Sequence, residues 1–172
     1  MLDDKKFPVK RIGNEKNPKI LILLSNPGGS PKHYKRLPEY IMDKDGVYKD
    51  ASMCMSDSRE YVEWWDNVLK ITDKYGIKES DVLALEYYPY HTVGSSDVPK
   101  CKDWDKYATD ALEENKNLLD KFINQNVLVF GYYWGNWVRE VKDLESYRNF
   151  YKSKNTMGQA GKIKELEKFL KK

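Results

Sequence analysis

Residues 19–31 read Lys-Ile-Leu-Ile-Leu-Leu-Ser-Asn-Pro-Gly-Gly-Ser-Pro. The five consecutive aliphatic residues at 20–24 predict a strand that is buried on both faces, as in a parallel sheet covered by helices. Pro27 ends this strand, and the two glycines after it let the backbone approach a ligand closely. Ligands of open α/β sheets bind outside the carboxyl ends of the strands. We therefore expect Asn26, at that end, to be the chemical centre.

Strands and helices alternate along the rest of the chain. Strands are expected at 81–88, 127–130 and near 147–151, and helices at 31–42, 57–75, 103–123, 134–141 and 159–170. Residues 1–18 show no strong periodicity, and 43–55 resemble an irregular loop or small hairpin. This order predicts the α/β class in a three-layer αβα architecture. Its middle layer is expected to be a parallel sheet of about four strands, with helices on both faces. The four loops after the strands should meet at one sheet edge.

The composition fits one soluble globular domain over residues 1–172. Hydrophobic residues make up 40% and charged residues 33% of the chain, and the formal net charge is +3. No apolar run is long enough to cross a bilayer, and the first residues lack the apolar stretch of a signal peptide. A cytoplasmic monomer without a membrane partner is therefore expected. The charge permits a polyanionic partner but does not require one.

Several common catalytic motifs are absent from the sequence. It contains no Gly-x-x-x-x-Gly-Lys-[Ser/Thr] phosphate loop, no Gly-x-Gly-x-x-Gly and no Gly-x-Ser-x-Gly. The only histidines are His33 and His91, which excludes a multi-histidine metal site. We expect no metal and no cofactor. On its own, Asn-Pro-Gly-Gly also fits a simple strand-ending turn.

Read together, the segments resemble the uracil-DNA glycosylase superfamily. Leu-Leu-Ser-Asn26-Pro27-Gly28 is similar to the family's first motif, in the Asn-Pro-Gly form of its mismatch-specific branch. Residues 82–86 resemble the strand whose end reads the flipped base, and 127–131 resemble the third strand and its turn. The resemblance runs from about residue 19 to 170. It implies a uracil-DNA glycosylase-like fold that hydrolyses the N-glycosidic bond of a damaged or mismatched base in DNA.

The resemblance also implies roles for the residues of the first loop. Asn26 would orient the attacking water, but a neutral amide cannot take the proton of that water as a carboxylate would. Slow turnover or a narrow substrate range is therefore expected. Gly28 stands where uracil-strict members carry a bulky tyrosine, and leaves the pocket open to larger bases. Tyr34 or Tyr40 would shape the pocket or stack on the base.

Glu86 stands where uracil-reading members have an asparagine. A carboxylate only accepts hydrogen bonds, so it would prefer N–H-rich edges such as those of cytosine or guanine. Alternatively, Glu86 pairs with a lysine or caps a backbone group. Residues 152–158 contain no histidine, whereas active family members carry one in this loop, so Lys154 or Asn155 would have to donate in its place.

Pro89-Tyr90-His91 shares letters with the Asp-Pro-Tyr-His motif of the uracil-strict enzymes but follows a different strand, so the roles are not transferred. His91 is expected either at the pocket mouth or as a structural hydrogen-bonding group. Two other functions remain open: an inactive nucleic-acid- or protein-binding module of the same fold, and a hydrolase of free nucleosides or nucleotides. The expected substrate-binding residues are Pro27, Gly28, Tyr34, Tyr40, Glu86, Tyr88, His91, Lys154 and Asn155.

Overall fold

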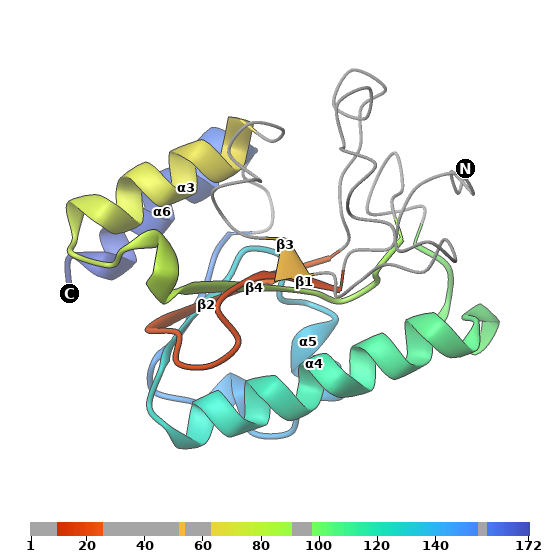
Figure 1. Ribbon diagram of the computed structural model, residues 1–172. Helices are drawn as coiled ribbons and strands as arrows, with labels where there is room; N and C mark the ends of the chain where they lie inside the picture. Colours follow the sequence, from red (N-terminus) through yellow and green to blue (C-terminus); the bar gives the residue numbers. More distant parts are fainter. Residues whose placement is uncertain (1–9, 26–51, 54–62, 91–97, 155–157) are drawn as a thin grey trace.

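A six-stranded sheet in the order β3-β1-β4-β2-β5-β6 forms the centre of the computed structural model, which describes residues 10–25, 52–53, 63–90, 98–154 and 158–172 (Figure 1). Strands β2, β4, β5 and β6 are parallel, β1 runs antiparallel to β4, and β3 pairs parallel with β1. The strands are β1 (Arg11–Gly13), β2 (Ile20–Leu24), β3 (Ser52–Met53), β4 (Val82–Glu86), β5 (Leu128–Gly131) and β6 (Phe150–Lys152).

The helices lie on both faces of the sheet. Figure 1 shows α3 (Glu63–Lys74) and α6 (Gln159–Leu170) side by side on one face, and α4 (Lys106–Asn124) and α5 (Trp137–Glu140) on the other. Short 3-10 turns occupy Glu79–Asp81, Cys101–Asp103 and Leu144–Ser146. The predicted α/β class, with helices on both faces of a mostly parallel sheet, is therefore confirmed at this level.

The four predicted strands are present as β2, β4, β5 and β6, but the expected count of about four strands was wrong. Strand β1 lies in the segment 1–18, which showed no periodicity, and the two residues of β3 lie in the expected loop 43–55. A three-residue strand such as β1 is too short to show an alternating pattern. Its position is fixed instead by pairing with β4, where Ile12 lies opposite Ala84.

The helix boundaries follow from local signals in the sequence. Helix α6 has the predicted bounds, while α4 begins at Lys106 because Asp105 caps it, its Oδ1 accepting the Ala108 N–H at 2.7 Å. Gly76 has φ +74°, as expected for a glycine that ends a helix. Helix α5 is shorter than the predicted 134–141. The expected helix 31–42 and the Asp57–Glu60 capping pattern lie outside the described residues.

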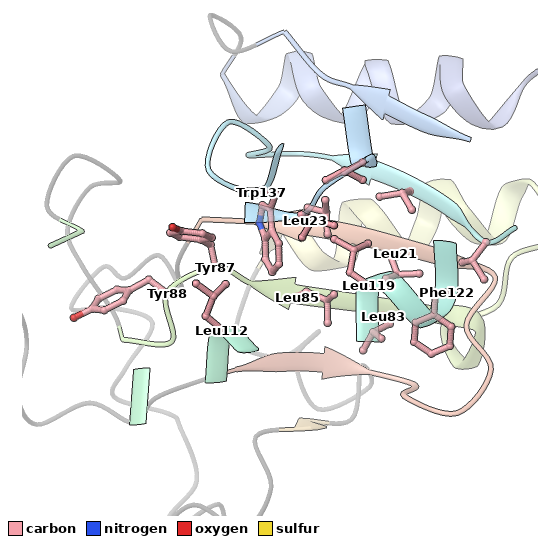
Figure 2. Close-up of a cluster of buried hydrophobic side chains, with 14 of the residues drawn as sticks. Leu21, Leu23, Leu83, Leu85, Tyr87, Tyr88, Leu112, Leu119, Phe122 and Trp137 are labelled. Atoms are coloured by element: carbon pink, nitrogen blue, oxygen red, sulfur yellow. The ribbon is translucent and has the colours of Figure 1, made fainter. Parts of the chain in front are cut away.

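Two hydrophobic cores cover the two faces of the sheet. In β2, Ile20, Ile22 and Leu24 face α3 and α6, whereas Leu21 and Leu23 face α4 and α5. Figure 2 shows the second core, with Leu119 and Phe122 of α4 packed against the strands. All five residues of β2 are buried, which confirms the prediction of burial on both faces. Within the described ranges, no helix is both long and apolar enough to span a membrane.

Candidate functional site

The carboxyl ends of the four parallel strands are aligned at one edge of the sheet. Leu24 of β2 lies opposite Glu86 of β4, Leu23 opposite Gly131 of β5, and Gly131 opposite Lys152 of β6. The segments that begin after these residues therefore leave the sheet at a common edge, as the sequence predicted. The described helix that follows β2 is α3, whereas the helix that follows β4 is α4, on the opposite face. Ligands of open α/β sheets bind where connections diverge in this way.

The end of β2 is held by hydrogen bonds to its backbone. The Leu24 carbonyl accepts the indole N–H of Trp137 at 2.7 Å and the backbone N–H of Tyr87 at 3.2 Å. The next carbonyl, of the buried Ser25, accepts the Tyr88 N–H at 2.8 Å. The backbone immediately before Asn26 is thus fixed in position.

Seven of the predicted site residues lie outside the described residues, and their roles stay predictions. They are Asn26, Pro27, Gly28, Tyr34, Tyr40, His91 and Asn155. The structure describes the remaining three, Glu86, Tyr88 and Lys154.

Glu86 is the last residue of β4 and only 4% exposed. Val82 and Ala84 face α3 and α6, so the alternation of the strand directs the Glu86 side chain to the same face. Its backbone is fully bonded: its N–H donates to the Lys10 carbonyl and its carbonyl accepts from Asn115 Nδ2, both at 2.9 Å. Glu86 therefore has a fixed backbone beneath its carboxyl group.

Within the described part of the chain, the carboxyl group of Glu86 is less well bonded than its backbone. Among the described residues, Oε2 has no hydrogen-bond partner and the side chain forms no ion pair, so the expected alternative of a lysine pair is not found there. Burial raises the pKa of Glu86 well above its usual range, which favours the neutral acid. A neutral acid offers one O–H donor and one acceptor, whereas the predicted preference for N–H-rich edges assumed an ionised carboxylate.

Tyr88 and Lys154 are not placed beside the Glu86 carboxyl. Tyr88 packs on the α4 side, with its ring 4.9 Å from that of Trp104 and 5.5 Å from that of Tyr90 (Figure 2). Lys154 follows β6 and is exposed, and its backbone N–H donates to Glu165 Oε2 at 2.7 Å. Of these three side chains, only that of Glu86 is buried on the α3/α6 face.

The structure adds two residues that the sequence analysis did not single out, Lys162 and Tyr133. Lys162 of α6 is 1% exposed, and its Nζ donates to the Tyr132 carbonyl at 2.6 Å. The same Nζ lies 3.5 Å from the ring centroid of Tyr133. Burial lowers the pKa of Lys162 to about 8, although the charge of Glu165 opposes this shift. In the sequence, Lys162 could have been found from its position four residues before Leu166, on the apolar stripe of the predicted helix 159–170.

Tyr133 lies between the ends of β5 and β2. It follows Gly131 by two residues, and its N–H donates to the Leu23 carbonyl at 2.9 Å. Burial raises the pKa of Tyr133, and the charge of the nearby Glu86 raises it further. Tyr133 therefore contacts the buried Lys162 through its ring, and its backbone is bonded to β2, the strand that lies next to Glu86. In the sequence, Tyr133 could have been found from its position in the loop after the third predicted strand.

Gly131 allows the loop after β5 to turn closely over β6. A Cβ atom at this position would lie 2.6 Å from Trp134 Cβ and 2.9 Å from Phe150 Cε2, closer than such atoms can approach. The indole N–H of Trp134 then donates to the Ser153 carbonyl at 2.8 Å. These contacts fix the start of the loop that carries Tyr133.

The described residues include no group of three or more histidine, cysteine or acidic side chains that could hold a metal ion. Comparison of the chain with protein-family models, curated proteins and solved structures finds no match.

Proposed function

We propose that the protein hydrolyses the N-glycosidic bond of a damaged or mismatched base in DNA, at the carboxyl edge of β2, β4 and β5. The observation that carries this proposal is the buried Glu86 carboxyl, whose Oε2 lacks a partner within the described chain, one strand away from the fixed end of β2. A buried polar atom without a partner costs about 1–3 kcal/mol, so such a group is expected to serve a ligand.

The roles of the residues follow from the resemblance to the uracil-DNA glycosylase superfamily. Asn26 would orient the water, Gly28 with Tyr34 or Tyr40 would shape the base pocket, and Glu86 would bind the edge of the base. Cleavage of the bond passes through a cationic sugar, so positioning a water and stabilising the departing base are the main requirements. The support from the structure is that the backbone before Asn26 is held by Trp137, Tyr87 and Tyr88.

The test is an excision assay on oligonucleotides that carry uracil, mismatched thymine, hypoxanthine or xanthine, with abasic sites detected by alkaline cleavage. We expect cleavage of at least one of these strands and its loss in Asn26→Ala. Asn124→Ala is the matched control, because Asn124 is exposed at the carboxyl end of α4, just before the amino end of β5. Excision that survives Asn26→Ala would remove this residue from the mechanism.

A second candidate function is binding of nucleic acid without cleavage. The observation that favours it is the absence of a histidine from residues 152–158, the loop where the resemblance implies one. This function predicts binding that weakens steeply with added salt and releases no base. Release of base from free nucleosides, but not from DNA, would instead indicate a nucleoside hydrolase.

A further inference from the structure

We propose that Tyr133 is an aromatic platform on which a planar heterocyclic ring stacks, beside the buried carboxyl of Glu86. This inference deepens the proposed function and rests on it for the class of ligand. It concerns the described residues alone and assigns a binding role to the loop after β5.

The first observation is the exposure of Tyr133. Among the described residues it is the one large hydrophobic side chain that is exposed, with 39% of its surface open. The neighbouring Tyr132 is 2% exposed, although both follow the same strand. An exposed aromatic ring at the edge where a ligand is expected is suited to stacking, because each base presents a flat face.

The second observation is that the Tyr133 ring is held in place. Lys162 Nζ lies 3.5 Å from its centroid, the Tyr132 ring meets it in a T-shaped arrangement at 5.1 Å, and its own N–H is bonded to Leu23. A cation over one face of a ring is attracted by its π electrons. The ring is therefore fixed before a ligand arrives, which lowers the entropic cost of binding.

The third observation is the neighbouring polar group. The Tyr133 N–H is bonded to the Leu23 carbonyl of β2, and the next residue of β2, Leu24, lies opposite Glu86, so Tyr133 and Glu86 are one strand apart at the same edge of the sheet. Glu86 Oε2 is buried and has no partner within the described part of the chain. A flat surface beside a buried polar atom without a partner matches a planar ring that carries hydrogen-bonding groups on its edge. A saturated ring with the same edge would fit the carboxyl but not the platform.

The test compares two free nucleosides, uridine and 5,6-dihydrouridine, by isothermal titration calorimetry. Both present the same carbonyl and N–H edge, but only uridine has a planar aromatic ring. We expect the wild-type protein to bind uridine about 5- to 150-fold more tightly, the range that stacking on one aromatic side chain supplies. Tyr133→Leu should remove this preference, whereas Tyr133→Phe should keep it.

Tyr75→Leu is the matched control for this experiment. Tyr75 is also partly buried and has a lysine, Lys74, 5.7 Å from its ring centroid, but it lies between α3 and β4, away from the carboxyl edge. The preference for uridine should survive in this variant. A wild-type protein that binds neither nucleoside or binds both equally, or a preference that survives Tyr133→Leu, would overturn the proposal.

If Tyr133→Leu does not fold, Tyr133→Met, which keeps a long apolar side chain without a ring, takes its place, and a preference for uridine that survives in it overturns the proposal. The assay does not require bond cleavage. Failure of the proposed function appears as missing abasic sites, whereas failure of the platform appears as equal affinity for the two nucleosides.

Discussion

On the α4/α5 face of the sheet, two aromatic side chains at the carboxyl edge, Tyr87 and Trp137, have partners for their polar groups. The Tyr87 hydroxyl lies 3.1 Å from Cys101 Sγ, and the indole N–H of Trp137 donates to the Leu24 carbonyl at 2.7 Å. On the α3/α6 face, Glu86 lacks such a partner within the described chain, and Tyr133 is exposed. Among the described residues, polar groups of the edge are therefore paired on the α4/α5 face, whereas the α3/α6 face has an unpaired carboxyl oxygen and an exposed ring.

Two buried glutamates make the contrast sharper. Glu86 and Glu165 are both 4% exposed, but Glu165 Oε2 accepts the Lys154 N–H at 2.7 Å, whereas Glu86 Oε2 has no described partner. Glu165 is therefore part of the structure that holds the segment after β6. Burial alone does not mark a functional group, and the missing partner is the feature that separates Glu86 from a structural residue.

The largest expected effect on stability is that of replacing Trp137, on the α4/α5 face. Trp137 is fully buried, and its replacement by alanine removes both the ring and the hydrogen bond to Leu24. We expect Trp137→Ala to lower the free energy of unfolding by about 3–5 kcal/mol in urea denaturation. Trp137→Phe keeps most of the ring and should cost about 0.5–1.5 kcal/mol, the contribution of one hydrogen bond, since the Leu24 carbonyl still accepts the Tyr87 N–H. If Trp137→Ala lowered the free energy of unfolding by less than about 1 kcal/mol, packing of Trp137 would not be what closes the α4/α5 face.

The second effect concerns the pH dependence of stability at Lys162. Its pKa is about 8 in the folded chain, below the ordinary lysine value of 10.5. Between these values the unfolded chain binds more protons, so this residue makes stability rise with pH across that window. We expect the free energy of unfolding of the wild type to gain about 2–3 kcal/mol relative to Lys162→Met between pH 8 and 10.5.

The measurement for Lys162 is urea denaturation of both proteins at several pH values in this window. Lys162→Met removes one donor from the Tyr132 carbonyl, but Ser153 Oγ still donates to that carbonyl at 3.1 Å. The variant should therefore fold. Stability curves that run parallel in the two proteins would show that Lys162 titrates as an ordinary solvated lysine.

The third prediction separates the two glutamates. Because burial raises the pKa of Glu86 in the folded chain, this group lowers stability as pH rises above the ordinary value of 4.5. Glu86→Gln keeps the shape and is neutral in both states. We expect it to be more stable than the wild type at pH 7, since it carries no group whose ionised form burial penalises. The difference should shrink towards pH 4.

Glu165→Gln is the control for this prediction. Its carboxylate accepts a backbone N–H, so the weaker acceptor should leave stability unchanged or lower it by about 0.5–1.5 kcal/mol. Thermal or urea denaturation at pH 4 and pH 7 measures both variants. A Glu86→Gln protein less stable than the wild type at pH 7 would indicate that the Glu86 carboxylate has a stabilising partner.

The parts of the fold that were predictable depend on residues close together in the sequence. The aliphatic run of β2, the apolar stripe of α6 and the glycine after α3 each carry a local signal. Strand β1 carries none, because its position depends on distant residues: Arg11 Nη1 donates to Glu114 Oε2 at 3.1 Å and to Asn115 Oδ1 at 3.3 Å. Those partners are more than 100 residues away along the chain.

The candidate site also has a part that the local sequence predicts and a part that only the tertiary structure shows. The place of Glu86 at the carboxyl edge followed from the strand pattern, but the upward shift of its pKa depends on burial by residues far away in the sequence. The contact between Lys162 and Tyr133 joins α6 to the loop after β5, and no local motif announces it. Local patterns therefore located the edge, while the difference between its two faces required the tertiary structure.

The smallest expected effect is the difference in stability between removing the Tyr87 hydroxyl and removing the Tyr133 hydroxyl, both at the carboxyl edge of the sheet. Tyr87→Phe removes the hydroxyl that lies 3.1 Å from Cys101 Sγ and donates to Glu140 Oε1 at 3.4 Å, so we expect a loss of about 0.5–1.5 kcal/mol in unfolding free energy. Tyr133→Phe alters a side chain that remains 39% exposed, and should change stability by less than about 0.5 kcal/mol. Equal losses in urea denaturation would mean that the Tyr133 hydroxyl supports the fold as the Tyr87 hydroxyl does. In that case the α3/α6 face would be closed as well, and a ring that stacks on Tyr133 would have to displace structure in order to bind.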